Sequence, residues 1–131
     1  MTTTIGQKIG EFQFDELVTD INPAVVVNGG VIKALASETT LKRGTILARS
    51  SGSGGSGKLV VLGTVAGENE TLTADCILCD DTVVGTSDVN ACVYFAGCFD
   101  PNKVIVADNY TITDADKDAL RSRGIFFKAA N

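Results

Sequence analysis

The 131-residue chain has no histidine and no tryptophan, and only two prolines. Without histidine it lacks the usual proton shuttle near neutral pH, which excludes Ser-His-Asp and Cys-His catalysis. Positive charge is also scarce, because the chain has 11 Lys and Arg residues and 16 Asp and Glu residues, which gives a net charge of −5. This balance argues against a nucleic-acid partner, which requires concentrated positive charge. We therefore expect a binding or structural protein without enzymatic activity.

Long apolar runs are missing too, since no stretch reaches the length of a membrane span. Residues 1–4 have neither the basic start nor the apolar stretch of a secretory signal. We expect no membrane association and folding in a cytoplasm, where cysteines stay reduced unless a metal or a redox reaction uses them. The length suits one domain with a substantial core.

Short β-branched and apolar segments, separated by glycine-rich turns, predict a mainly β fold. The expected strands are 24–27, 31–35, 45–48, 58–65, 75–79, 91–98, 103–106 and 125–127. Asn28-Gly29-Gly30 predicts a tight hairpin turn between the first two strands. Asp100-Pro101-Asn102 predicts a second turn.

One short helix is predicted near the C-terminus. Thr113 is a suitable N-cap, and the acidic residues after it lie at the positive end of the helix dipole. Arg121 and Arg123 occupy the negative end, and Gly124 ends the helix.

Residues 1–20 differ from the remaining 21–131, which we interpret as one compact β-rich domain. In residues 1–20 the apolar side chains are widely spaced, and Phe12 and Phe14 alternate with polar residues as in a short strand. The segment is either an extended arm that pairs with a partner or the first strand of the domain's own sheet. The residues that would attach such an arm are Thr2, Thr3, Thr4, Ile5, Ile9, Phe12 and Phe14.

The segment Gly52–Lys58 matches the start of a phosphate-binding loop. The match fails at Leu59, which stands where Ser or Thr would bind Mg²⁺, and a strand follows instead of a helix. We interpret residues 52–57 as a mobile, dispensable hairpin tip, because Gly and Ser offer no apolar side chain to offset the entropy of ordering. No cofactor is expected.

The cysteines form two pairs in the sequence, Cys76-x₂-Cys79 and Cys92-x₅-Cys98. There are two alternatives to buried thiols. One is a zinc site with four thiolate ligands, and the other is a disulfide or redox role. The second spacing is long for zinc, and an apolar strand surrounds the first pair. We therefore expect buried, metal-free thiols.

Charged residues offer two further candidate sites. Asp75, Asp80 and Asp81 could bind a divalent cation or form an acid/base pair. Asp80 and Asp81 are adjacent, so on a strand their side chains would point to opposite faces and would not converge. We therefore expect solvated carboxylates. One basic concentration could meet an acidic partner surface, and it consists of Lys42, Arg43, Arg49 and Lys58.

Four stretches together carry a family resemblance, and they are 41–48, 74–81, 93–99 and 110–127. Their order, and the ending of helix, Arg-Gly and aromatic strand, resemble the head decoration proteins of tailed bacteriophages, of the lambda type. The likeness covers residues 22–128. The Gly/Ser loop at 50–57 departs from the pattern.

The resemblance implies a small β-clip-like or barrel domain that forms a homotrimer on the outer capsid surface, after assembly in the bacterial cytoplasm. Such trimers occupy three-fold and quasi-three-fold sites of the expanded shell and cement neighbouring major capsid proteins against internal DNA pressure. An N-terminal arm contributes to attachment, and residues 1–20 correspond to it in position. The alternatives are a small zinc- or thiol-containing β-module that binds another protein, and a small enzyme with a cysteine nucleophile.

Overall fold

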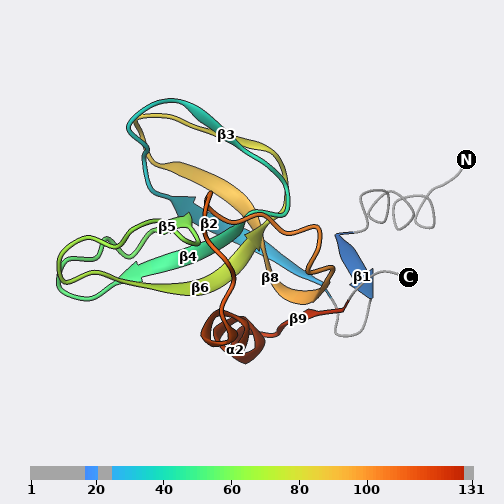
Figure 1. Ribbon diagram of the computed structural model, residues 1–131. Coiled ribbons are helices and arrows are strands. Elements are labelled where there is room, and N and C mark those ends of the chain that lie inside the picture. Colours follow the sequence, from blue (N-terminus) through green and yellow to red (C-terminus); the bar gives the residue numbers. More distant parts are fainter. Residues whose placement is uncertain (1–16, 21–24, 129–131) are drawn as a thin grey trace, which may run out of the picture.

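A computed structural model describes residues 17–20 and 25–128 (Figure 1). The strands within them are β1 (Val18–Asp20), β2 (Val26–Ile32), β3 (Thr39–Leu41), β4 (Ile46–Ser51), β5 (Leu59–Val61), β6 (Thr71–Leu78), β7 (Thr82–Val84), β8 (Val89–Phe99) and β9 (Ile125–Phe127). The helix is α2 (Asp114–Arg123). The described part of the chain is therefore mainly β with one short C-terminal helix, which confirms the predicted fold class.

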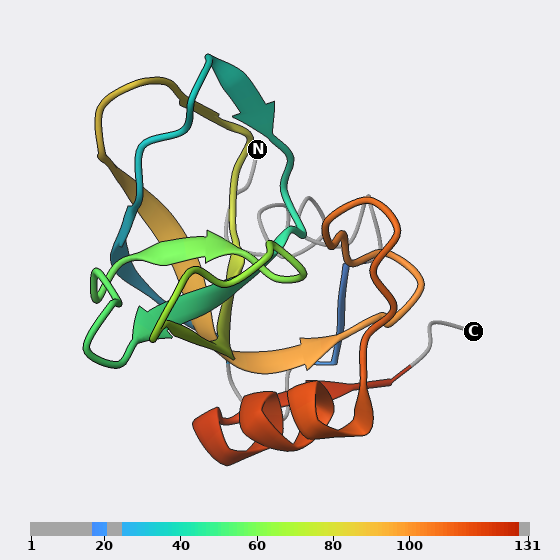
Figure 2. The ribbon, with the colours of Figure 1, turned by 60° about the vertical axis from the view of Figure 1, so that its left-hand side comes forward.

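Five of the strands close into a small mixed barrel (Figure 2). Their order is β8-β2-β5-β4-β6, and β6 pairs with β8 to complete the circle. All of these pairings are antiparallel except the β2–β5 contact, which is parallel and joins Ile32 to Leu59. The short strands β3 and β7 form a separate antiparallel ribbon.

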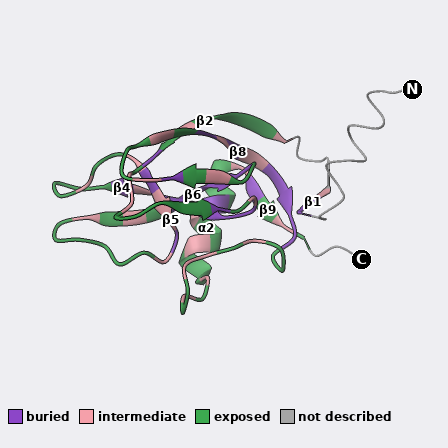
Figure 3. Cartoon of the chain, turned by 90° about the horizontal axis from the view of Figure 1, so that it is seen from above, coloured by how far each residue is buried: buried purple, intermediate pink, exposed green. Residues whose placement is uncertain are grey.

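Alternation along the strands creates two cores, one inside the barrel and one outside it. The inner core contains Leu47, Leu59, Cys76, Leu78 and Val93, all fully buried. The outer core lies between the barrel wall and α2 with β9, and it includes Ile46, Ile77, Tyr94, Phe99, Leu120 and Ile125. Figure 3 shows buried residues along much of β6 and β8, exposed residues in the loops, and a β2 that is mostly exposed. Helix α2 thus covers a barrel face that would otherwise expose apolar side chains.

The predicted hairpin at Asn28-Gly29-Gly30 is wrong, because these residues lie within the continuous strand β2. They pair with β8 in unbroken register from Val27↔Tyr94 to Ile32↔Val89. A Cβ on Gly30 would lie 2.7 Å from Leu59 Cδ1, so glycine here makes room for the neighbouring strand β5. The glycines therefore permit close packing and do not form a turn.

Residues 103–106 form no strand, contrary to prediction. The segment runs beside the entrance to β4 and makes one isolated parallel bridge, Thr45↔Ile105. The Ile46 amide donates to the Ile105 carbonyl at 2.8 Å, and the Ile105 amide donates to the Gly44 carbonyl at 3.0 Å. This segment braces the turn into β4 without joining the barrel.

The predicted helix signals are confirmed. Thr113 accepts a hydrogen bond from the Asp116 amide, while the Asp116 carboxylate accepts one from the Thr113 amide, which completes a capping box. Gly124 ends the helix in the left-handed conformation with φ of 104°. The chain then enters β9, which pairs in parallel with the end of β8.

The Gly/Ser hairpin between β4 and β5 is present, but its backbone packs against a neighbouring turn, which the interpretation as a mobile, dispensable tip did not include. The Gly54 amide donates to the Asn69 carbonyl at 2.9 Å, and Ser50 Oγ accepts from the Ser56 amide at 3.0 Å. A Cβ on Gly54 would lie 2.1 Å from the Glu68 carbonyl oxygen. The loop backbone thus rests on the turn before β6, and glycine is required for that approach.

We expect Gly54→Ala to destabilise the protein by about 1–3 kcal/mol, because the added methyl group forces two loop backbones apart. Gly85→Ala is the matched control, since a Cβ there would meet nothing within 4 Å. The control is expected to leave stability unchanged or to raise it by about 0.4–1 kcal/mol. Urea unfolding measures both variants, and equal midpoints would show that the loop moves freely.

Candidate functional site

The predicted attachment residues lie outside the described residues, and they are Thr2, Thr3, Thr4, Ile5, Ile9, Phe12 and Phe14. The end of the predicted arm is described and belongs to the folded body. Leu17 is 1% exposed and packs in the outer core, and β1 pairs antiparallel with the end of β8 through Val18↔Phe99. The Asp100 amide also donates to the Leu17 carbonyl at 2.8 Å. An arm that precedes the body is therefore confined to residues 1–16.

The end of β8 lies between β1 and β9, so these short strands form the two edges of a small three-stranded sheet (Figure 1). Within the described part of the chain, neither edge strand has a second neighbour. Phe126 on β9 is 38% exposed. Unpaired edge amides and carbonyls can bind an added strand through main-chain hydrogen bonds.

Exposed apolar side chains gather on β2. Val26 and Val27 are each 49% exposed and Val31 is 42% exposed. Val27 and Val31 share one face of the strand, with Gly29 between them. Next to them is a shallow hollow of about 290 Å³ lined by Asn28, Gly29, Asn90, Ala91 and Cys92. This valine strip (Val26, Val27 and Val31) suits contact with another protein surface.

All four residues of the predicted basic concentration engage partners within the chain. Those partners are Asp81 for Lys42, the Cys79 carbonyl and the Tyr94 ring for Arg43, Asp75 for Arg49, and Asp88 for Lys58.

The glycine-rich segment before Lys58 does not have the geometry of a phosphate site. It leads into β5, so no helix N-terminus follows it to hold a phosphate. The Lys58 ammonium group contacts Asp88 and lowers the pKa of that carboxyl, as does a hydrogen bond from the Ala34 amide.

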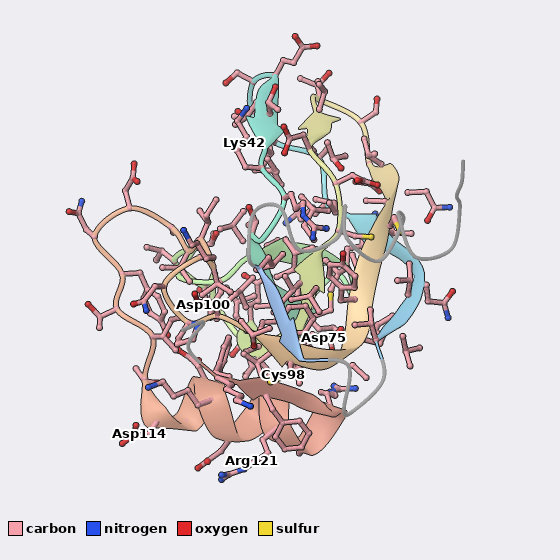
Figure 4. The ribbon with its side chains drawn as sticks, turned by 90° about the vertical axis from the view of Figure 1, so that its right-hand side faces the viewer. Lys42, Asp75, Cys98, Asp100, Asp114 and Arg121 are labelled. Atoms are coloured by element: carbon pink, nitrogen blue, oxygen red, sulfur yellow. The ribbon has the colours of Figure 1, made fainter. Side chains whose placement is uncertain are left out.

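Asp75 is buried, contrary to the expectation of a solvated carboxylate. Its side chain is 2% exposed and lies on β6 between two guanidinium groups, 3.2 Å from Arg49 of β4 and 3.0 Å from Arg123 of α2. Figure 4 shows Asp75 in the interior, above α2. Asp81 instead accepts from the Arg43 amide at 2.8 Å. The three predicted carboxylates therefore do not converge, and Asp75 serves to tie the helix to the barrel.

The four cysteines do not converge on one zinc site. Cys76 lies inside the barrel, where burial and then the charge of Asp75 raise its thiol pKa. Cys98 is buried elsewhere, 3.5 Å from the Thr19 hydroxyl. Cys79 and Cys92 face each other with their sulfur atoms 2.7 Å apart. Among the described residues, the one group with metal-ligand potential is Cys79, Cys92 and the exposed Asp80.

Burial, and then the Cys92 side chain, raise the pKa of Cys79 to about 12. A nucleophilic cysteine needs a lowered pKa, because the thiolate is the reactive form. Burial of Cys79 therefore disfavours its thiolate, the form that a nucleophilic role would require.

No protein-family model matches the sequence, and no curated protein is significantly similar to it. The described residues include no helix of the length and apolarity required to cross a bilayer. The features that local patterns missed are the valine strip, the ion pairs of Asp75 and the Cys79–Cys92 contact. The signal for the buried aspartate was available, because Asp75 stands between Ala74 and Cys76 in a predicted apolar strand.

Proposed function

We propose that the protein decorates the outer surface of an expanded bacteriophage capsid as a homotrimer. It occupies three-fold and quasi-three-fold sites and cements neighbouring major capsid proteins against internal DNA pressure. The protein performs this task by binding, without enzymatic activity, cofactor, nucleic acid or membrane. Its location is the virion, after assembly in the bacterial cytoplasm.

The observation that carries the proposal is the place where the N-terminal segment joins the body. Residues 1–16 lead into β1, which is an edge strand in the described part of the chain. A segment with spaced apolar side chains that precedes an edge strand in the sequence suits strand addition to a partner. The sequence resemblance over residues 22–128 supports a capsid as that partner, and the small barrel agrees with the fold that the resemblance implies.

Expanded capsids provide the direct test. Purified protein is mixed with expanded shells and, as a control, with unexpanded shells, and both are sedimented and imaged by cryo-electron microscopy. We expect saturable binding to the expanded shells and density at three-fold-related positions. Equal binding to both shells, or density away from those positions, would contradict the proposal.

We expect the free protein to run at three times its chain mass of 13.6 kDa in light scattering on a sizing column. Three-fold sites favour a three-fold assembly, since linked contacts raise the effective concentration. The valine strip is the surface that the trimer would bury. Val27→Asp with Val31→Asp should therefore yield monomers.

The matched control for the strip is Val83→Asp on β7. Val83 is also an exposed valine, at 53%, but it lies on the β3–β7 ribbon. The control should remain trimeric. Monomeric wild-type protein at micromolar concentration, or equal dissociation of both variants, would argue against this interface.

A further inference from the structure

Cys79 and Cys92 are brought together by the seam where the barrel closes. Strand β6 pairs with β8 through Ile77↔Tyr94 and Leu78↔Val93, so the next position places Cys79 directly opposite Cys92. The Cys79 amide donates to the Cys92 carbonyl at 3.0 Å, which holds this register. The sulfur atoms lie 2.7 Å apart. A displacement of less than about 1 Å would bring them to the covalent distance of about 2.05 Å.

The two cysteines differ in accessibility. Cys79 is 7% exposed, whereas Cys92 is half-buried and lines the shallow hollow beside the valine strip. On the β2 side the residue paired with Cys92 is Gly29, which has no side chain to cover the sulfur. A small reagent can therefore reach Cys92 from solvent, while Cys79 lies behind it.

We propose that Cys79 and Cys92 form a reversible disulfide that links β6 to β8. The co-reactant is a low-molecular-weight disulfide such as oxidised glutathione. The Cys92 thiolate attacks one sulfur of the reagent and releases one small thiol, which leaves a mixed disulfide on Cys92. The Cys79 thiolate then attacks Cys92 Sγ and releases the second small thiol. Two protein thiols are oxidised, and one small disulfide is reduced to two thiols.

The order of attack follows from the surroundings of the pair. Burial raises the pKa of Cys79 to about 12, the neighbouring Cys92 and Asp80 act in the same direction, and Arg43 opposes them. Cys79 is therefore a poor first nucleophile, but it is correctly placed for the second, intramolecular step. The disulfide carries no charge, so this apolar position suits it better than a thiolate.

The bond would close segment 79–92, which contains β7 and hence one strand of the β3–β7 ribbon. Closing a loop of this size reduces the entropy of the unfolded chain and lowers the unfolding equilibrium constant by about 100-fold. In a reducing cytoplasm the pair remains a dithiol, and in oxidising surroundings it becomes the link. The inference does not depend on capsid binding. It applies to the monomeric chain, because a trimer that buries the valine strip would also cover the hollow at Cys92.

The test uses the full-length protein, diluted until light scattering shows monomers, with oxidised glutathione as the probe, and compares it with protein kept in dithiothreitol. After acid quenching, intact mass should show the loss of two hydrogens, and peptide mapping should find Cys79 linked to Cys92. Urea unfolding of the oxidised wild-type protein should show the fall of about 100-fold in the unfolding constant. This comparison requires no mutation.

Three variants locate the bond. Cys79→Ser and Cys92→Ser should each prevent the loss of two hydrogens, whereas Cys98→Ser should retain it. Three results would overturn the inference: four free thiols after oxidation, a glutathione adduct on Cys92 that never resolves, or a link through other cysteines. Zinc bound by Cys79, Cys92 and Asp80 in protein purified without chelator would also overturn it, in favour of a metal site.

Discussion

Deletion of residues 2–14 is expected to abolish binding to expanded capsids while the thermal midpoint of the free protein stays nearly unchanged. On a strand added to a capsid sheet, Phe12 and Phe14 would share one face, and burying each ring contributes about 1.5–3 kcal/mol before ordering costs. Three arms per trimer strengthen this contribution through linkage. The deletion spares Leu17 and β1, so the described body keeps its core.

A longer deletion of residues 2–20 is the matched comparison. It also removes Leu17, which is 1% exposed, and strand β1, which pairs with the end of β8. The loss of one buried leucine side chain alone costs about 2–5 kcal/mol, so this variant should unfold at a much lower temperature. Calorimetry and capsid co-sedimentation on both deletions separate attachment from stability. Capsid binding by the shorter deletion, or a collapse of its midpoint, would refute the proposed role of the arm.

Removing both guanidinium partners of Asp75 is expected to be the most destabilising change of charge in the described residues. In the double variant Arg49→Met with Arg123→Met, the Asp75 carboxylate, which is 2% exposed, loses both ion pairs. An uncompensated buried charge costs about 3–5 kcal/mol. Each single variant should cost far less, because the other arginine remains beside Asp75. Urea unfolding of the two singles and the double variant measures the non-additivity directly.

Two controls distinguish the buried charge from a simple loss of arginine. Arg121 pairs with Asp118 on the same helix, where both side chains are about two-thirds exposed, at 65% and 66%. Arg121→Met should therefore change stability by less than about 1 kcal/mol. Adding Asp75→Leu to the double variant should restore most of the lost stability, since an apolar side chain can fill the position without a charge. If the double variant loses only as much free energy of unfolding as the two single variants lose together, and both single losses are small, the account is refuted.

Local chemistry was sufficient for the C-terminal helix. The side chain of Thr113, the backbone freedom of Gly124 and the charges between them act within a few residues, so their effect is the same in most surroundings. The alternating apolar segments likewise determined a mainly β chain.

Features that depend on distant strands were decided by the tertiary structure. Asn28-Gly29-Gly30 has a strong local preference for a turn, but β8 pairs with this segment throughout and Leu59 packs against Gly30. Many inter-strand hydrogen bonds and close packing then outweigh one turn propensity.

The same distinction applies to the candidate sites. That Asp75 is buried was indicated by its apolar neighbours in the sequence, but its partners come from β4 and α2, far along the chain. Cys79 and Cys92 meet because β6 and β8 adopt one register, and a shift of one residue would turn the two sulfur atoms to opposite faces. The sequence alone therefore determined the fold class and the helix, through forces that act between neighbours. The barrel closure, the Asp75 ion pairs and the cysteine contact required the tertiary structure, because register and packing join residues that no local pattern connects.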